Sequence, residues 1–307
     1  MNKPSTNVLE IAASHDLSPL QAQIENRLSD LVPSDQTWPV KLHAAQRHAL
    51  LSPGKRFRPL LCVLIARGAT KDIAKRQAAI DVGCAAEMVH AASLILDDLP
   101  CMDDAALRRN NPTTHIAFDE STAILSATSL LNRAFGVLAR LRDIDPAIRI
   151  ALVDLLSYSV GSTGLIAGQM ADLANDDSQT NLQDVERLNR LKTGALFEFT
   201  IYSAAILTEH TVGRKEELKD FAYHLGLGFQ LLDDLKDSLM DDTQAEKTVG
   251  RDEGKATILA LLGSEESKHT LKTYLASAKA ALHRAGLQNS TLLESVIDRQ
   301  FAFLNDV

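Results

Sequence analysis

The chain is poor in the two residues that most often mark linkers and turns. Its 307 residues include nine prolines and fifteen glycines, thinly scattered rather than gathered in runs. A connection between separate modules is usually rich in proline, glycine and small polar residues. The sequence therefore argues against a linker-rich architecture. We interpret residues 1–307 as a single domain with a flexible polar start at 1–17.

Positive charge is also scarce. The chain has 32 Lys and Arg against 40 Asp and Glu, which gives a formal net charge of −8 at pH 7. Because a nucleic-acid-binding protein needs a basic face, we expect no nucleic-acid partner. Against this acidic background, the local basic clusters around Lys55 and Arg108 are informative.

Signals for secretion or membrane insertion are missing as well. The segment from Met1 to Asp16 lacks the basic-then-apolar pattern of a signal peptide, and no apolar run reaches the ~18 residues of a membrane-spanning helix. The three cysteines, Cys62, Cys84 and Cys101, are odd in number and lack metal-ligand spacing. We interpret them as reduced thiols, two of them in the core. We expect a soluble, cytoplasmic protein without a membrane span.

No window of the chain favours a β-strand. From Leu20 onward the apolar residues recur at helical spacing, as in Ile24, Leu28 and Leu31. We expect an all-α bundle of roughly ten or more helices around a central cavity, the usual place for a bundle to build a metal site. The long predicted helices cover residues 57–68, 72–99, 119–142, 146–174, 181–208, 214–239, 264–286 and 288–304.

Carboxylates are concentrated at the end of one predicted helix. An apolar run that ends at Leu96 is followed by Asp97, Asp98, Asp103 and Asp104, and then by two arginines. Carboxylates this dense repel one another, so folding alone rarely explains them. Mg²⁺ is typically held by one or two carboxylates together with phosphate oxygens, and arginine forks match phosphate geometry. The pattern therefore favours a site for a metal-bound phosphate.

A second acidic run lies on a later apolar helix. It contains Asp233, Asp234 and Asp237. In a helix, Asp233 and Asp237 are neighbours on one face, about 5–6 Å apart at Cβ. We predict that the two acidic clusters face each other and clamp a metal-bound diphosphate between them.

The two clusters resemble the first and second aspartate-rich (DDxxD-type) motifs of the trans-prenyl diphosphate synthases. The first has the longer form common in bacterial short-chain enzymes, with Pro100 and Cys101 inserted, and the resemblance runs from about Leu50 to Leu262. It implies an isoprenoid-synthase helical bundle, usually a homodimer, that binds three Mg²⁺ ions. The implied reaction is head-to-tail condensation of isopentenyl diphosphate with dimethylallyl, geranyl or farnesyl diphosphate.

The resemblance also implies roles for individual residues. The implied metal ligands are Asp97, Asp98, Asp103 and Asp233, with Asp237 acting through hydrogen bonds or metal-bound water and Asp234 beside them. The implied ligands of isopentenyl diphosphate are Lys55, Arg58, His90 and Arg109. The implied ligands of the allylic diphosphate are Arg108, Lys192, Lys247 and Lys255, and the oxygen dipoles facing the developing cation belong to Thr193 and Gln230. Glu87, one helical turn before His90, is a candidate partner for that imidazole.

Product length is expected to depend on the residues below the first cluster. In short-chain relatives the position five before the first aspartate is often aromatic and stops growth at C15, whereas here it is Ala92, with Ser93 beside it. Five residues of helix span ~7.5 Å, so small side chains there leave the channel open. A helical wheel places Ser93 more nearly in line with Asp97. We predict a C20 product in preference to C15.

Two other readings share the same fold. A terpene synthase would keep the acidic clusters but generally lacks the basic motif around Lys55 and Arg58, because it does not bind isopentenyl diphosphate. A non-catalytic regulatory subunit of a heteromeric prenyl synthase would show degenerate aspartates, whereas both clusters are intact. Prenyl transfer is therefore the preferred interpretation.

Overall fold

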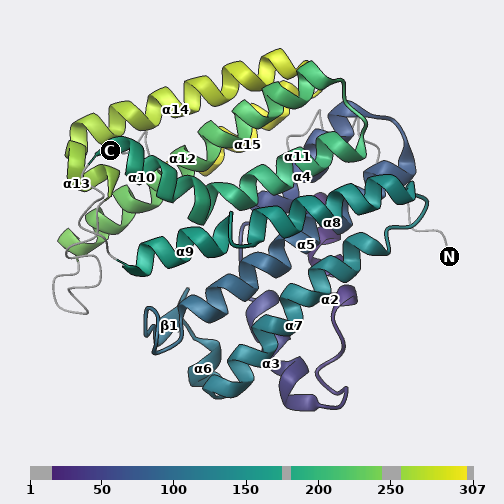
Figure 1. Ribbon diagram of the computed structural model, residues 1–307, viewed down its shortest axis with the longest axis vertical. Coiled ribbons are helices and arrows are strands. Elements are labelled where there is room, and N and C mark those ends of the chain that lie inside the picture. Colours follow the sequence, from purple (N-terminus) through teal and green to yellow (C-terminus); the bar gives the residue numbers. More distant parts are fainter. Residues whose placement is uncertain (1–15, 175–180, 244–256, 303–307) are drawn as a thin grey trace. The chain divides into compact units, whose positions relative to one another are not determined.

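The computed structural model describes residues 16–174, 181–243 and 257–302, almost all of them helical, which confirms the all-α prediction (Figure 1). Contacts group the chain into two compact units: unit 1 is Met1–Val153 with Gln288–Ser295, and unit 2 is Asp154–Leu287 with Val296–Val307. Two helices, α8 (Pro146–Val160) and α15 (Ser290–Gln300), contribute residues to both units. The single domain over 1–307 stays a prediction.

Unit 1 is built around one long helix, α5 (Ile73–Asp97), which packs against α4 and α7 (Figure 1). The side chain of Asp72 caps its first turn by accepting a hydrogen bond from the Lys75 N–H at 3.1 Å. Its middle is rich in alanine, the best helix former. The other helices of this unit are α2 (Ser18–Leu31), α3 (Val40–Leu50), α4 (Phe57–Ala69), α6 (Thr114–Ala117) and α7 (Glu120–Ala139).

The start of α4 is pressed against α5. Every α4 side chain from Phe57 to Ala66 is buried. Gly83 of α5 lies so close to Pro59 that a Cβ atom at position 83 would be 2.8 Å from the Pro59 Cα. This close approach fixes the first turn of α4, and with it the basic segment that precedes Phe57.

A two-residue β-hairpin follows the first acidic cluster, where the sequence predicted no strand. Its strands are β1 (Leu107–Arg108) and β2 (Asn111–Pro112), paired antiparallel. The two turn residues, Arg109 and Asn110, have φ of 52° and 63°. A two-residue hairpin turn of type I′ has positive φ at both central positions, and asparagine adopts it readily. Asn110 therefore suits its place.

Unit 2 contains α12 (Val212–Thr243), which runs beside α14 (Ser264–Ala285) in Figure 1. The single helix predicted for 146–174 is interrupted after Val160, because the chain turns at Gly164, where a Cβ would be 2.1 Å from the Ser159 carbonyl oxygen. The predicted helix 181–208 contains a π-helical turn. The remaining elements are α9 (Leu165–Ala174), α10 (Leu182–Asn189), the π-turn η1 (Arg190–Gly194), α11 (Ala195–Leu207) and α13 (Ile258–Leu262).

Three helical stretches are long and apolar enough to cross a membrane, judged by length and composition alone. They are Ile73–Asp97, Glu120–Ala139 and Pro146–Ala174, and 72% of the apolar window of the first is buried within the protein. The sequence prediction of no membrane span considered only uninterrupted apolar runs, so it did not identify these stretches. The absence of a membrane span stays a prediction. The expected core thiols are confirmed, because Cys62 and Cys84 are buried.

Candidate active site

The first acidic cluster lies where α5 ends and the chain folds back over the helix terminus. The Asp103 N–H donates to the Asp97 carbonyl at 2.8 Å, and the Asp104 N–H donates to the Leu99 carbonyl at 3.0 Å. The first of these bonds brings the backbone of Asp103 beside that of Asp97, although residues 98–102 separate the two in the chain. Two of the predicted metal ligands are therefore brought together by local structure alone.

The electrostatics of this helix end favour a bound cation. The C-terminal end of a helix carries partial negative charge, which adds to the repulsion among the carboxylates. Among the residues that the structure describes, no group of three or more His, Cys, Asp or Glu side chains could hold a metal by itself. Mg²⁺ does not need such a group, since one or two carboxylates and substrate phosphate oxygens suffice. Asp97 and Asp103 fit this kind of site.

Asp98 is held by an arginine. Its side chain is 4% exposed, and it accepts from Arg108 Nε at 3.0 and 3.1 Å and from Arg108 Nη2 at 2.8 Å. A buried carboxylate is stable only when it is paired and hydrogen-bonded. Asp98 was expected to bind metal directly, and this stays a prediction, because a carboxylate has lone pairs beyond those that Arg108 occupies. What the structure shows is a carboxylate that orients Arg108.

A cleft in unit 1 gathers several predicted substrate ligands. It is lined by His90, Arg108 and Arg109, together with Arg56 and Glu87. The predicted cations Lys55 and Arg58 do not line it but flank Arg56 in the chain. The cleft therefore gathers three guanidiniums, of which Arg56 and Arg108 are paired with the lining carboxylates Glu87 and Asp98.

His90 is neutral in this cleft at neutral pH. Burial lowers the pKa of His90 well below its ordinary value, and the charges of Arg58, Arg109, Arg108 and Arg56 lower it further. A neutral imidazole has one N–H donor and one acceptor nitrogen. His90 can thus donate a hydrogen bond to a phosphate oxygen while the arginines supply the charge.

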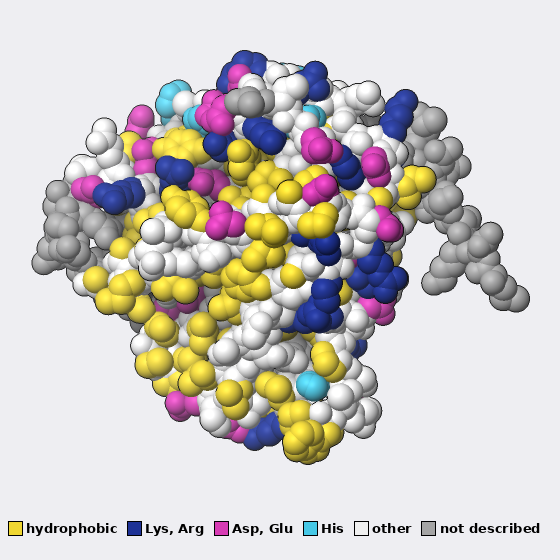
Figure 2. All heavy atoms as spheres, turned by 45° about the vertical axis from the view of Figure 1, so that its right-hand side comes forward, with side chains coloured by type: hydrophobic (Ala, Val, Ile, Leu, Met, Phe, Trp, Pro, Cys, Tyr) yellow, Lys and Arg dark blue, Asp and Glu magenta, His cyan; other side chains and the backbone are white. Residues whose placement is uncertain are grey.

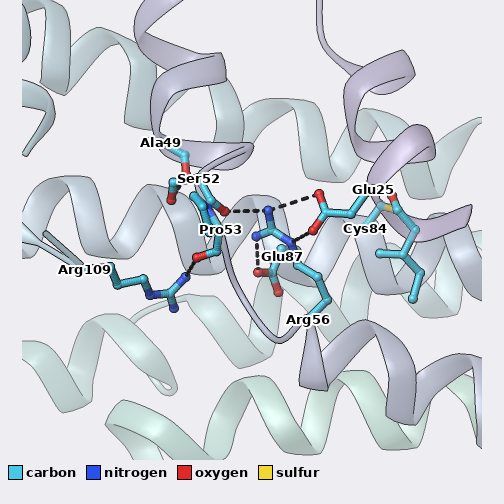
Figure 3. Close-up of polar contacts among 9 residues, drawn as sticks. Glu25, Ala49, Ser52, Pro53, Arg56, Cys84, Glu87 and Arg109 are labelled. Carbon is cyan, nitrogen blue, oxygen red and sulfur yellow. Dashed lines mark hydrogen bonds and ion pairs between the residues drawn. The ribbon is translucent and has the colours of Figure 1, made fainter. Parts of the chain in front are cut away.

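Glu87 does not pair with His90, and this sequence prediction is wrong. Its Oε1 accepts from Arg56 Nη1 at 2.8 Å, and Arg56 also binds Glu25 at 2.7 Å (Figure 3). Glu87 pairs with Arg56 because a buried carboxylate is stabilised by an opposite charge, which a neutral imidazole does not offer. Sequence reasoning missed Arg56, although it lies inside the basic motif, because motif spacing does not show which cations point inward.

In unit 2, the π-turn η1 presents Lys192 and Thr193. Gly168 of α9 packs against it, and a Cβ there would be 2.4 Å from the Lys192 backbone nitrogen. On its other side, a Cβ on Gly226 of α12 would be 2.9 Å from the Gly194 Cα. π-turns often mark functional sites. The two glycines let both helices close on this wide turn and fix its position.

The polar side chains of this turn are oriented by partners. Lys192 Nζ forms an ion pair with Asp172 Oδ2 at 2.5 Å. Thr193 Oγ1 donates to Gln230 Oε1 at 2.5 Å, and Gln230 Nε2 donates to Asp234 Oδ1 at 2.8 Å. Because the hydroxyl proton of Thr193 is committed to Gln230, its lone pairs remain available to a developing cation. The roles of Thr193 and Gln230 toward such a cation stay predictions.

The second acidic cluster lies on α12. Asp233 and Asp234 are both partly exposed, and Asp237 follows one turn later on the same helix, but its side chain lies outside the described part of the structure. The predicted phosphate ligands Lys247 and Lys255 also lie outside the described residues. Because the two acidic clusters belong to different units, their convergence stays a prediction.

The two proposed chain-length positions differ in environment. Ala92 is 3% exposed, in the packed part of α5. Ser93 is partly exposed, and its Oγ donates to the His90 carbonyl at 2.9 Å. The Ser93 hydroxyl is therefore satisfied by its own helix.

Comparison with known proteins identifies the family of this chain. The family model for polyprenyl synthetase matches residues 39–286, most of the chain. The chain belongs to the polyprenyl synthetase family. This polyprenyl synthetase is a prenyltransferase of the geranylgeranyl and farnesyl diphosphate synthase type.

Two curated relatives illustrate the range of the family. Geranylgeranyl diphosphate synthase of Pantoea ananas is 38% identical over 286 residues, covering 92% of this chain and 93% of the relative. Farnesyl diphosphate synthase of Geobacillus stearothermophilus is 37% identical over 258 residues, covering 83% and 86%. The polyprenyl synthetase is thus almost equally similar to enzymes named for C20 and for C15 products, so overall identity does not decide its product.

Solved structures agree with the fold. A farnesyl and geranylfarnesyl diphosphate synthase of Zymomonas mobilis, solved without ligand, has a TM-score of 0.81 at 35% identity, covering 92% of this chain and 96% of that chain. A geranyltransferase of Helicobacter pylori, complexed with magnesium and isoprenyl diphosphate, has a TM-score of 0.82 at 27% identity and full coverage of both chains. The polyprenyl synthetase therefore has the all-α isoprenoid-synthase fold.

Proposed function

We propose that this chain catalyses the Mg²⁺-dependent head-to-tail condensation of isopentenyl diphosphate with an allylic diphosphate, giving the C20 product geranylgeranyl diphosphate in preference to C15. The roles of individual residues belong to the same proposal. What supports the use of magnesium is the pair Asp97 and Asp103 at the negative end of α5, together with the magnesium named in the Helicobacter pylori complex.

The cleft of unit 1 binds isopentenyl diphosphate in this proposal. Arg109 and neutral His90 contact its phosphates, and Lys55 and Arg58 approach from the preceding loop and the first turn of α4. Cations and a hydrogen-bond donor suit a diphosphate without need of metal. The double bond is thereby held in place for attack.

The allylic diphosphate is bound by cations that are themselves oriented by carboxylates. Asp98 fixes Arg108, and Asp172 fixes Lys192. Three Mg²⁺ ions held by Asp97, Asp103 and Asp233, with Asp237 in support, would supply positive charge to the departing diphosphate. Preorganised charge of this kind lowers the barrier because it is aimed at the group on which negative charge develops.

The bond changes balance without an outside reagent. The C1–O bond of the allylic substrate breaks and its electron pair leaves with diphosphate. The double bond of isopentenyl diphosphate then attacks C1 of the allylic cation, and a proton is lost to the departed diphosphate. The lone pairs of Thr193 stabilise the cation until attack. Water would quench it, so the site has to exclude water.

The small side chain of Ala92 carries the product-length proposal. An aromatic residue there should place a floor about 7.5 Å below Asp97 and shorten the product from C20 to C15. The test is to incubate the pure protein with Mg²⁺, labelled isopentenyl diphosphate and each allylic primer, and to size the products. The wild type should make C20, and Ala92→Phe should make C15.

Ser93→Phe is the companion variant, because it lies more nearly in line with Asp97 and is less buried than Ala92. If only this variant shortens the product, the floor is at Ser93. A wild type that stops at C15, or two variants that both leave C20 unchanged, would refute this placement of the floor.

We also propose that the enzyme is a homodimer in the cytoplasm, with a second copy covering apolar surface. In unit 1, Ile124 and Leu125 of α7 are 45% and 61% exposed, and Ile150 of α8 is 70% exposed. Figure 2 shows hydrophobic side chains exposed on one face of the molecule. Exposed apolar patches are typical of interaction sites. The pure protein should sediment as a dimer, and Leu125→Glu should shift it toward monomer. If Leu125→Glu still sediments as a dimer, the apolar surface of α7 and α8 is not the dimer interface.

A further inference from the structure

Arg56 lies between Lys55 and Arg58 in the chain, but its side chain is less exposed than that expected of a substrate ligand. Its side chain is 3% exposed, whereas Lys55 is exposed. A cation that captures an incoming diphosphate needs donors that are not already used. Arg56 therefore has another role, and its contacts show which.

The guanidinium of Arg56 makes four hydrogen bonds to protein groups. Nε and Nη2 donate to the Glu25 carboxylate at 2.7 and 3.3 Å, Nη1 donates to Glu87 Oε1 at 2.8 Å, and Nη2 donates to the Ser52 carbonyl at 2.8 Å (Figure 3). A guanidinium has five N–H donors, so little of this one is left for substrate.

These contacts fasten the loop that precedes α4. Glu25 belongs to α2, Glu87 belongs to α5, and Ser52 lies in the loop itself. From the other side, Arg109 Nη1 donates to the Pro53 carbonyl at 2.9 Å (Figure 3). The loop from 52 to 56 is thus held by arginines at its first two carbonyls, those of Ser52 and Pro53.

Gly54 leaves room for this arrangement. A Cβ at position 54 would be 2.7 Å from Arg109 Nη1 and 3.4 Å from Arg56 Nη1. Both guanidiniums therefore close on the loop at the one residue without a side chain. This contact also connects the basic loop to the β-hairpin turn, because Arg109 is a residue of that turn. Arg109 is itself a predicted ligand of isopentenyl diphosphate.

The backbone of Arg56 is in an unusual conformation. Its φ is 48° and its ψ is 40°, the left-handed region that side-chain-bearing residues disfavour. Such a conformation persists where surrounding contacts over-determine it, and it often accompanies function. At this position it turns the chain from Lys55 into the first turn of α4, where Arg58 lies.

The charge of Glu87 gives Arg56 a second task. Glu87 is 6% exposed and lines the same cleft as His90 and Arg109. An unpaired buried carboxylate is strongly unfavourable, and here it would also repel a diphosphate. Arg56 neutralises it from within the protein.

We propose that Arg56 is a positioning residue for isopentenyl diphosphate. Held by Glu25, Glu87 and the Ser52 carbonyl, it sets the loop that presents Lys55 and Arg58, and it does not contact substrate. This inference rests on the proposed assignment of the cleft to isopentenyl diphosphate.

The primary test is Arg56→Gln with both kinetic and direct binding measurements. We expect the KM for isopentenyl diphosphate to rise at least about tenfold, with kcat and the KM for the allylic substrate within about twofold, since the loss is one of ground-state binding. Calorimetry with isopentenyl diphosphate alone, where no turnover occurs, should show the same loss in Kd. An unchanged Kd, or an equal rise in both KM values, would overturn the inference.

Two further variants separate position from charge. Arg56→Lys keeps the charge that neutralises Glu87 but loses the fork, so its Kd should stay about fivefold or more above wild type. The double variant Arg56→Gln with Glu87→Gln removes one charge of each sign, so charge balance is restored. The loop is still not fastened by a guanidinium, so binding of isopentenyl diphosphate should stay weak. Full recovery in either variant would overturn the positioning role.

The matched control is Arg27→Gln. Arg27 also joins α2 to α5, through a two-pronged ion pair with Asp81 at 2.6 and 3.1 Å, but it does not contact the basic loop. Its loss should leave both KM values within about twofold of wild type. Equal effects of the two arginine variants would show that general packing of α2 on α5 is responsible, against the inference.

Glu25→Gln covers the case in which Arg56→Gln does not fold. Glu25 is 40% exposed, and its replacement leaves Arg56 paired with Glu87. We expect a rise of about threefold in the Kd for isopentenyl diphosphate, with a melting temperature near wild type. An unchanged Kd would count against the inference. If the wild-type protein itself fails to bind isopentenyl diphosphate, the proposed function fails instead.

Discussion

Replacing Asp97 with asparagine is expected to lower kcat about a thousandfold and to raise the half-saturating Mg²⁺ concentration about tenfold. Asp97 is the last residue of α5, at the negative end of the helix, and its backbone carbonyl accepts from the Asp103 N–H; a cation there relieves the repulsion among the carboxylates. An amide keeps the shape but removes the charge. Initial rates measured against Mg²⁺ concentration, and calorimetry of Mg²⁺ with pyrophosphate, would show the shift.

Replacing Asp98 with asparagine should give a different signature. Its carboxylate holds Arg108 through three hydrogen bonds, and an amide cannot accept on both sides or balance the charge. We expect kcat/KM for the allylic substrate to fall about a hundredfold, while the Mg²⁺ requirement stays near that of the wild type. The same Mg²⁺ titrations would distinguish the two variants.

Asp104→Asn is the matched control for both variants. It removes one charge from the same cluster, at an exposed residue with φ of 48°, a conformation that asparagine tolerates. Its rates and Mg²⁺ dependence should stay within about threefold of wild type. If Asp98→Asn instead shifts the Mg²⁺ dependence as Asp97→Asn does, Asp98 is a metal ligand and the account of it as a positioning residue is wrong.

The sequence predicted the helices well because their signals are local and repeated. Apolar spacing located α4, α5 and α7, and the predicted helix boundaries at 286 and 181 lie within one residue of those in the structure, where Asn181 accepts a hydrogen bond from the Asp184 N–H at 3.0 Å. Gly286 has a φ of 66°, which glycine adopts without strain. Caps and breakers act within one turn of helix, so they can be recognised from neighbouring residues.

Departures from the predicted helices depend on contacts between elements. The π-turn at Arg190–Gly194 and the hairpin around Arg109 leave no periodic pattern, because neither involves more than six residues. Their positions are set by partners elsewhere in the chain, such as Gly168 against Lys192 and Pro53 with Arg109. The family resemblance singled out Lys192 and Arg109 but did not show what holds them.

The same division applies to the charged residues of the site. The family resemblance assigned Asp98 to metal and Arg108 to the allylic diphosphate, whereas the structure pairs the two side chains with each other. It selected Lys55 and Arg58 and passed over Arg56, because which cation is buried depends on Glu25 and Glu87, which are distant in the chain. Pairing among buried charges is a property of tertiary structure, so chain order alone did not contain it.

Replacing Gly168 with alanine is expected to lower kcat/KM about a hundredfold, because a shift of about 1 Å in catalytic groups can cost that much. The added Cβ would be 2.4 Å from the Lys192 nitrogen, 2.7 Å from the Leu191 carbonyl carbon and 2.8 Å from the Lys192 Cα. All three are backbone atoms, so no side chain can rotate away. The π-turn itself has to move, and Lys192 and Thr193 move with it. Steady-state kinetics with both substrates would measure the loss.

Gly213→Ala is the matched control, since it makes the same substitution on α12 where a Cβ meets nothing within 4 Å. Its activity should match wild type, and alanine should stabilise the helix by up to about 1 kcal/mol. Gly168→Ala should instead lose about 1–3 kcal/mol of stability to overpacking. Thermal melts followed by circular dichroism would separate that loss from the loss of activity. If Gly168→Ala melts lower yet retains full kcat/KM, the placement of Lys192 and Thr193 by the π-turn does not matter for catalysis.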